Sequence, residues 1–213
     1  GFCAIFVLDY IVVASRISSY SSHSGSFSAY IESGSCGNDA SALLRNELEP
    51  NLGLTGSGQE VSIMRSTLIR TGIWVENNGR PSLCLKPKDS YMEEMLRVIE
   101  EFLVDAGKKD RVSFDELYKR LIFPEYHIGI RRGLIPIYLA VVIHEYKREI
   151  VIFDQHGQVP LNADTLVQIN AKPNIFYLSY LDWDPEKDTY VKQLTDIFSD
   201  YVIDEEKQKK KKN

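Results

Sequence analysis

The sequence predicts an α+β fold, mostly helical, built from winged-helix units in which two helices are followed by a β-hairpin. The order helix, helix, hairpin occurs twice, once before residue 88 and once after it. The second occurrence contains a helix that is almost entirely apolar, which is typical of the centre of a core. With 44% hydrophobic and 26% charged residues, the chain has an ordinary globular composition and can bury such a core.

The chain divides into four segments at changes of composition. The first holds an apolar, strand-like run followed by many Ser and Gly residues, and the last ends in a Lys-rich tail. The apolar run is shorter than the about 20 residues that a membrane-spanning helix needs, so no membrane partner is expected. A small winged-helix-like unit and a clearer winged-helix domain lie between these ends. The predicted boundaries are 1–38, 39–88, 89–182 and 183–213.

The segment 39–88 begins with a helix that ends at Pro50. A second helix is predicted from Gln59 to a glycine at its C-terminal cap, Gly72. Two apolar stretches then flank the turn 77–79, whose Asn-Asn-Gly sequence tolerates the positive φ angles of tight turns. The pattern predicts a hairpin and so completes the first helix, helix, hairpin order.

The segment 89–182 holds the clearest helix pattern of the chain. Ser90 is expected to cap an amphipathic helix whose apolar residues recur every three or four positions. Ser113 and Glu116 have the spacing of a capping box and open a second helix. A third helix, nearly all apolar, is predicted to end at Tyr146.

A hairpin and further elements follow this third helix. Residues 150–153 predict a strand, 155–157 a turn and 159–161 a second strand. Asn162 is expected to cap a short helix, and a final strand is predicted within 174–181. Helix, turn, helix and hairpin is the order of a winged helix.

The net charge of −5 is distributed unevenly. The tail 207–212 carries +5, so residues 1–206 carry −10. A C-terminal helix is predicted before this tail, at 190–203. Residues 108–148 have a net charge of +4, whereas residues 149–206 have −9. An acidic chain with one basic segment can contact nucleic acid locally without being a general binder of polyanions.

Sequence motifs of the common catalytic and metal sites are missing. The four histidines lie in no zinc-binding spacing, the three cysteines form no CxxC pair, and no Walker A or GxSxG motif occurs. The glycine-rich loop 53–58 lacks the Lys-Ser/Thr ending of a phosphate loop, and the carboxylates within 182–188 lack the spacing of an EF-hand. We therefore expect no catalytic residues, no cofactor and no metal. An enzyme whose active site is brought together only by the tertiary structure is the least favoured of the possible functions.

Basic residues around the third helix form the candidate nucleic-acid-binding site: Lys119, Arg120, Arg131, Arg132, Lys147 and Arg148. In a winged helix these positions lie near the helix that enters the major groove and on the wing beside it, and Arg can contact phosphate or guanine. The same side chains could instead be solvated, or paired with Asp115, Glu116 or Glu125, and many winged helices bind proteins. The apolar third helix favours this second interpretation, since few of its positions are free to read bases.

Residues 126–140, Tyr-His-Ile-Gly-Ile-Arg-Arg-Gly-Leu-Ile-Pro-Ile-Tyr-Leu-Ala, resemble a segment of large bacterial P-loop NTPases from phage-resistance loci, such as the BrxC-like proteins of BREX systems. In that family a hairpin like 150–161 follows the segment, which lies well downstream of the ATPase domain. The resemblance covers roughly residues 113–180. Because this chain has no Walker A motif, the resemblance implies a non-ATPase part of a larger protein, namely a regulatory or nucleic-acid-contacting module in bacterial defence.

The sequence thus predicts a non-catalytic winged-helix module that binds DNA or a protein partner and, in its parent, couples that contact to an ATPase domain. Three unpaired thiols indicate a reducing compartment, so a cytoplasmic location is expected. The alternative is a structural domain for protein interaction or oligomerisation that binds no nucleic acid.

Overall fold

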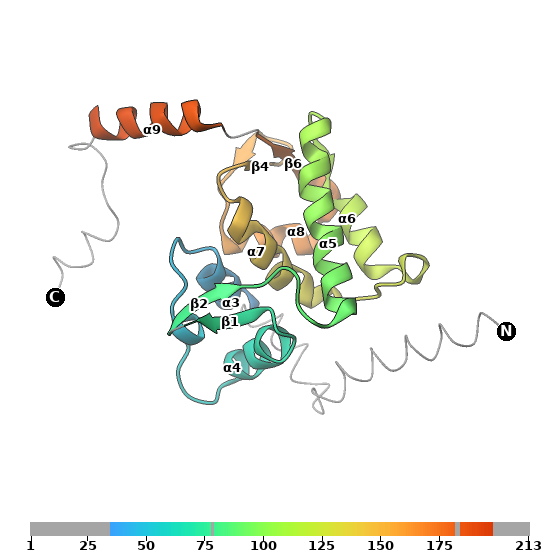
Figure 1. Cartoon of the computed structure of the whole chain (residues 1–213). Coiled ribbons are helices and arrows are strands. Elements are labelled where there is room, and N and C mark those ends of the chain that lie inside the picture. The colour runs from blue at the N-terminus through green and yellow to red at the C-terminus, as the bar shows by residue number, and fades with distance from the viewer. Residues whose placement is uncertain (1–34, 78, 182–183, 198–213) are drawn as a thin grey trace. The chain divides into compact units, whose positions relative to one another are not determined.

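The computed structural model describes residues 35–77, 79–181 and 184–197. The expected N-terminal strand, most of the Ser/Gly-rich segment and the Lys-rich tail lie outside the described residues. The chain separates into two compact units, Gly1–Tyr180 and Leu181–Asn213. Its helices and two antiparallel sheets confirm the predicted α+β class (Figure 1).

The first elements occur in the predicted order of two helices and a hairpin. Helix α3 spans Ser35–Leu43, and helix α4, Gln59–Met64, continues into a π-helical turn, η2, at Arg65–Ile69. The hairpin consists of the antiparallel strands β1, Trp74–Asn77, and β2, Arg80–Leu83.

Backbone with positive φ angles connects these elements. The helical segment ends at Ile69, three residues before the predicted cap, and the chain then turns at Gly72, with φ 77°. The hairpin turns at Gly79, with φ 75°, a conformation that favours glycine. Between α3 and α4 lies a short turn, η1, at Pro50–Gly53. Within η1, the buried Leu52 has φ 57°, a conformation that is uncommon for a branched side chain.

Helix α5, Ser90–Asp105, is amphipathic as predicted, but Asp89 rather than Ser90 caps it. Asp89 Oδ1 accepts hydrogen bonds from the backbone N–H groups of Tyr91 and Met92, at 3.0 and 3.2 Å. A carboxylate satisfies these free N–H groups and also interacts favourably with the helix dipole, which explains the shift by one residue. The buried stripe of α5 consists of Met92, Met95, Leu96, Ile99, Phe102 and Leu103.

The third helix follows α6 through an irregular connection. Helix α6, Phe114–Ile122, starts directly after strand β3, Val112–Ser113, and Ser113 Oγ accepts the N–H of Asp115 at 3.3 Å. The connection contains two 3₁₀ turns, η4 at Pro124–Tyr126 and η5 at Arg132–Leu134. The third helix, α7, then spans Ile135–Tyr146.

The second sheet has the strand order β3-β6-β4-β5 and is antiparallel throughout. Strand β6 pairs with both β3 and β4, so the hairpin β4–β5 is extended by a strand from later in the chain. Local patterns predict the hairpin but not this pairing, because it joins residues far apart in sequence. The bounds are Ile150–Phe153 for β4, Gln158–Val159 for β5, Ala163–Ala171 for helix α8, Pro173–Ile175 for η6 and Tyr177–Tyr180 for β6.

One hydrophobic core joins both helix, helix, hairpin segments. Its buried residues range from Ala40 on α3 to Leu178 on β6. Helix α7 lies within this core and contacts α3, α5 and α8, which surround it in Figure 1. The predicted boundary after residue 88 therefore crosses a continuous core.

The second unit is described at helix α9, Pro185–Ile197, which covers the described part of the helix predicted at 190–203. Asp184 Oδ1 accepts the backbone N–H of Lys187 at 2.8 Å, and the pKa of Asp184 is lowered mainly by this bond. Tyr190 and Ile197 are exposed on α9. Across the described ranges, no helix combines the length and the apolar character that crossing a membrane would require.

Candidate nucleic-acid interface

Helix α7 is buried on all sides along most of its length. Every residue from Gly133 to Ile143 is buried, and several, such as Leu139, have no exposed surface. A helix that reads bases in the major groove must present one open face to the DNA. Because α3, α5 and α8 pack around α7, it has no such face and acts as the scaffold of the core.

The polar end of α7 holds the C-terminus of α3. His144 Nδ1 lies 2.6 Å from the carbonyl oxygen of Leu43, and Lys147 Nζ donates to the carbonyl oxygen of Arg45 at 2.5 Å. A carbonyl only accepts, so Nδ1 of His144 carries the proton of this bond. Cations and donors suit the free carbonyls at a helix C-terminus. Partial burial lowers the pKa of Lys147. Through its bond to Arg45, this predicted nucleic-acid contact is engaged within the protein.

Arg132 serves the C-terminus of α8 in the same way. Its Nε donates to the carbonyl oxygen of Asn170 at 2.8 Å, and a terminal nitrogen donates to that of Ala171 at 3.2 Å. Its guanidinium carbon also lies 5.7 Å from the centre of the Tyr118 ring. These bonds join the start of α7 to the end of α8 and give Arg132 a structural role.

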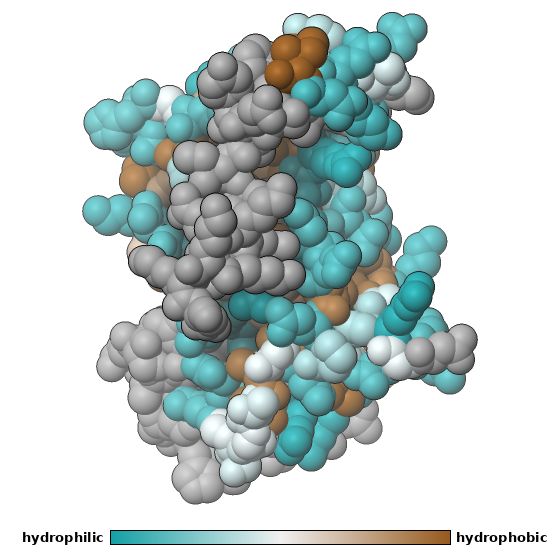
Figure 2. All heavy atoms as spheres, turned by 90° about the vertical axis from the view of Figure 1, so that its left-hand side faces the viewer, coloured by the Kyte–Doolittle hydropathy of each residue, from teal (hydrophilic) through white to brown (hydrophobic). Residues whose placement is uncertain are grey.

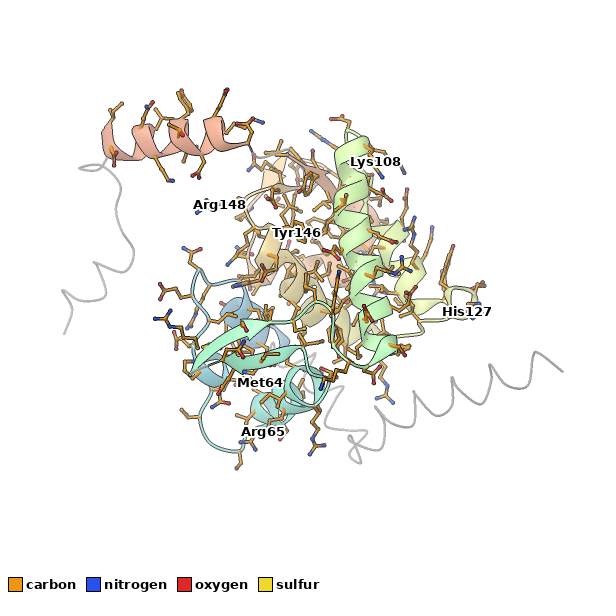
Figure 3. The ribbon with its side chains drawn as sticks, in the orientation of Figure 1. Met64, Arg65, Lys108, His127, Tyr146 and Arg148 are labelled. Atoms are coloured by element: carbon orange, nitrogen blue, oxygen red, sulfur yellow. The ribbon has the colours of Figure 1, made fainter. Side chains whose placement is uncertain are left out.

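The other predicted site residues are not gathered into one surface. Lys119 forms an ion pair with Asp115 at 2.6 Å, which raises the pKa of the lysine, and Arg120 is half-buried on the same helix. Arg131 and Arg148 are exposed at opposite ends of α7. Figure 3 shows Arg148, two residues after Tyr146, beyond the C-terminal end of α7 and directed outward.

The tip of the β4–β5 hairpin is acidic rather than basic. Asp154 Oδ1 accepts the backbone N–H groups of His156 and Gly157, at 2.7 and 3.0 Å. A wing that contacts DNA approaches the phosphate backbone, which a carboxylate at the tip disfavours. The predicted wing therefore lacks the charge that the DNA hypothesis requires of it.

Tyr146 takes part in a polar contact between helices. Its hydroxyl donates to Glu100 on α5, and its ring lies 6.5 Å from that of Tyr180. Burial, followed by the bond to Glu100, raises the pKa of Tyr146, so the hydroxyl stays protonated and remains a donor. The contact ties α5 to α7 beneath the sheet.

The segment formed by α4 and η2 has an open polar face that α7 lacks. Val61, Met64 and Leu68 are buried on one side of it, and Figure 3 shows Met64 toward the hairpin and Arg65 on the outer side. Residues three and four apart share a helix face. The open face carries the exposed residues Ser62, Arg65, Ile69 and Arg70 and the half-exposed Gln59 and Ser66.

This face includes a local departure from the α-helix. The N–H of Arg70 donates to the carbonyl oxygen of Arg65 at 2.9 Å, which is the i+5 bond of a π-helical turn. Such turns are rare in helices and occur frequently at functional sites. The wider turn places Arg65 and Arg70 at its two ends.

A hairpin with one exposed arginine adjoins this helix. Strand β1 contacts η2, and β2 starts with the exposed Arg80 directly after the hairpin turn. Residues 59–88 contain five basic and two acidic side chains, a net charge of +3. One of the two acids, Glu60, accepts a hydrogen bond from Asn38 at 2.9 Å. We call Arg65, Arg70 and Arg80 the basic face.

The basic face was missed by the sequence interpretation, although a signal for it exists. The apolar residues at 61, 64 and 68 mark the buried side, which leaves the arginines on the other side. The Asn-Asn-Gly turn then predicts a hairpin whose second strand begins at Arg80. The basic residues near α7 are denser in sequence, but their contacts within the protein depend on the tertiary structure and are not visible in the sequence.

A second exposed feature lies in the connection between α6 and α7. Phe123 directly precedes the turn η4 and Tyr126 is its last residue; their exposed fractions are 46% and 52%. The next residue, His127, has φ 62°, and Figure 3 shows it on this connection at the margin of the unit. By contrast, most of the described surface seen in Figure 2 is hydrophilic, with small separate hydrophobic patches. Exposed aromatic side chains are common at protein interfaces.

The described residues offer no group of three His, Cys, Asp or Glu side chains that could hold a metal ion. Comparisons with protein-family models, with curated proteins and with solved structures give no match to this chain.

Proposed function

We propose that the chain is a winged-helix-like module that binds duplex DNA through the basic face on α4, η2 and the β1–β2 hairpin. The observation that carries this proposal is the pairing of an open helix face, which bears Arg65 and Arg70, with a neighbouring hairpin whose second strand begins at the exposed Arg80. Both resemble the parts that a winged helix uses on DNA, a helix for the groove and a wing for the backbone. The site thus differs from the one expected around α7.

The chemistry of the basic face suits a phosphate backbone. Arginine donates two parallel hydrogen bonds to phosphate, and at a base edge it pairs with guanine. Because the chain is acidic as a whole, binding depends on this local charge and weakens steeply with salt.

The resemblance to the non-ATPase region of phage-resistance NTPases suggests a setting for this contact. In that setting the chain is a part of a larger protein, and DNA binding by the basic face is coupled to an ATPase domain of the same parent. Helix α7 is then the rigid centre that connects the DNA-contacting elements to the rest of the module.

A second candidate function, binding of a protein partner, is favoured by the exposed pair Phe123 and Tyr126. Large aromatic residues concentrate binding energy at protein interfaces, and two of them exposed at one turn are unusual for a solvated loop. This function would use the opposite kind of contact, apolar and insensitive to salt.

Fluorescence anisotropy with a labelled DNA duplex separates these functions. We expect binding at about 50 mM salt that falls steeply by about 200 mM salt. The double variant Arg65→Glu/Arg80→Glu should lose this binding, because two phosphate contacts become repulsive. The matched variant Arg131→Glu/Arg148→Glu, with the same charge change near α7, should bind nearly as tightly as the wild type.

Other outcomes have definite meanings. If the Arg131/Arg148 variant lost binding and the Arg65/Arg80 variant did not, the DNA-binding site would lie around α7. No binding by the wild type at low salt would reject DNA as the ligand and favour the partner-binding function. Circular dichroism of both variants checks that the charge changes leave the fold intact.

A further inference from the structure

The outer face of the β3-β6-β4-β5 sheet carries an aromatic pair that the proposed function does not use. In the sheet register, Phe153 on β4 lies opposite Tyr177 on β6. Their neighbours Ile152 and Leu178 are buried at 1% and 0% exposure, so the alternation of a strand places the two aromatic rings on the other side. Tyr177 is 36% exposed and Phe153 is half-buried.

A guanidinium group lies on the same face. The guanidinium carbon of Arg111 is 3.9 Å from the centre of the Phe153 ring, a close cation–π contact. Arg111 precedes β3, and β6 lies between β3 and β4 in the sheet. The side chain of Arg111 therefore extends across β6, which brings its charge to the middle of the face, where it remains exposed.

The surroundings of this group are polar and free of negative charge along the strands. The four strands contain no Asp or Glu. The outward positions beside the aromatic pair are the half-buried Ser113, Val151 and Ser179 and the exposed Gln158, which pairs with Phe153. Lys108 and Lys109 stand just before Arg111, and Lys108, labelled in Figure 3 at the end of α5, is paired with Asp105 at 2.7 Å. The turn that contains Lys108 contacts β6.

We propose that this face, formed by Arg111, Phe153 and Tyr177, binds single-stranded nucleic acid. Unpaired bases stack on aromatic rings and on guanidinium planes, and neighbouring strands about 4.8 Å apart present two such surfaces side by side. The serine hydroxyls can bond base edges, while Arg111 and Lys109 attract the phosphates. This site goes beyond the proposed duplex contact, because it involves other residues and a different form of nucleic acid.

The chemistry favours this occupant over a peptide. A Pro-rich peptide also packs on aromatic side chains, but it carries no charge for the arginine at the centre of the face. Single-stranded nucleic acid supplies both a π surface for the rings and an anion for Arg111 and Lys109. The charge at the middle of the face is therefore the feature that selects the ligand.

The test is an anisotropy titration with labelled oligo(dT) and oligo(U) at about 50 mM salt, with a labelled polyproline peptide as the competing probe. We expect at least one oligonucleotide to bind, and preference between them shows whether the natural strand is DNA or RNA. Tyr177→Ile, which replaces the ring with a β-branched side chain that also favours strands, should weaken binding about tenfold through the loss of one stacked base. Arg111→Gln should weaken it as well and reduce its salt dependence.

Matched variants distinguish this site from the duplex site. Tyr190→Leu, an exposed tyrosine on α9, should bind oligonucleotide like the wild type. Arg65→Glu/Arg80→Glu should lose duplex binding but keep single-strand binding. The two activities are therefore measured separately, and either proposal can fail while the other holds. Absence of oligonucleotide binding, unchanged affinity in both the Tyr177 and Arg111 variants, or binding of the polyproline peptide alone would overturn the inference.

Discussion

At the scale of single residues, several arginines and lysines of this protein stabilise helix ends. Arg132 and Lys147 both donate to backbone carbonyls at the C-termini of other helices, and Lys119 is paired on its own helix. These carbonyls have no partner within their helices, so a cation from elsewhere in the chain stabilises them. A dense group of basic residues in sequence is therefore a weak indication of a nucleic-acid site until their partners are known.

Arg132 allows a direct test of this role. Arg132→Gln removes the guanidinium that binds the carbonyls of Asn170 and Ala171, and we expect it to lower the free energy of unfolding by about 1–3 kcal/mol. Arg65→Gln, at an exposed arginine, should change it by less than about 0.5 kcal/mol. Urea unfolding of the two variants measures the difference, and equal stability of both would show that the Arg132 contacts contribute nothing.

Lys147 gives a second test, at the contact between α7 and α3. Lys147→Met keeps an unbranched side chain of similar length but removes the charge-assisted hydrogen bond to the carbonyl oxygen of Arg45. We expect the free energy of unfolding to fall by about 1–2 kcal/mol. Lys172→Met, at an exposed lysine, is the matched control and should be nearly neutral. Thermal unfolding followed by circular dichroism compares them. A neutral Lys147→Met variant would mean that α3 stays docked without this bond.

At the scale of elements, the local patterns predict most helices and both hairpins. The stripe of α5, the caps at Ser113 and Asn162 and the Asn-Asn-Gly turn depend on neighbouring residues alone, so the sequence shows them directly. The pairing of β6 with β3 and the packing of α3 on α7 join distant residues, and no periodicity reveals them. For the same reason, the apolar sequence of α7 predicts a core helix but does not show that neighbouring helices cover it on all sides.

An ion network on α5 predicts a dependence of stability on pH. Arg97 bonds Glu94 at 2.5 Å and also contacts Glu101, and the bond from Arg97 is the main cause that lowers the pKa of Glu94 below 4.5. When the pKa of a carboxyl is lower in the folded protein than in the unfolded chain, the fold is stabilised at a pH above the pKa of the unfolded chain. This stabilisation is lost as the pH falls through the pKa of the folded protein.

The variant Arg97→Gln isolates this effect. We expect the urea midpoint of the wild type to fall between neutral pH and about pH 3.5, and to fall less in the variant, which lacks the partner of Glu94. The difference is small because both side chains are exposed and solvent screens the pair. An equal fall in both proteins would assign the acid sensitivity to other carboxylates.

At the scale of the whole molecule, the proposed DNA binding depends on where positive charge is open to a ligand. Residues 35–180 carry 17 basic and 19 acidic side chains, a net charge of −2, so the unit has no general attraction for DNA. Residues 59–88, at +3, are the segment in which arginines lie on an open helix face next to a hairpin. The segment around α7 is similarly basic in sequence, but its charges are distributed among contacts within the fold.

The most direct test of the duplex-DNA proposal is hydrogen exchange measured by mass spectrometry, on the protein alone and with a DNA duplex at low salt. Slower exchange on DNA addition within residues 59–83, with no change within residues 114–146, is the predicted result, because the contact would cover α4, η2 and the β1–β2 hairpin. Protection confined to residues 114–146 would contradict the account and place the DNA contact at the helices around α7.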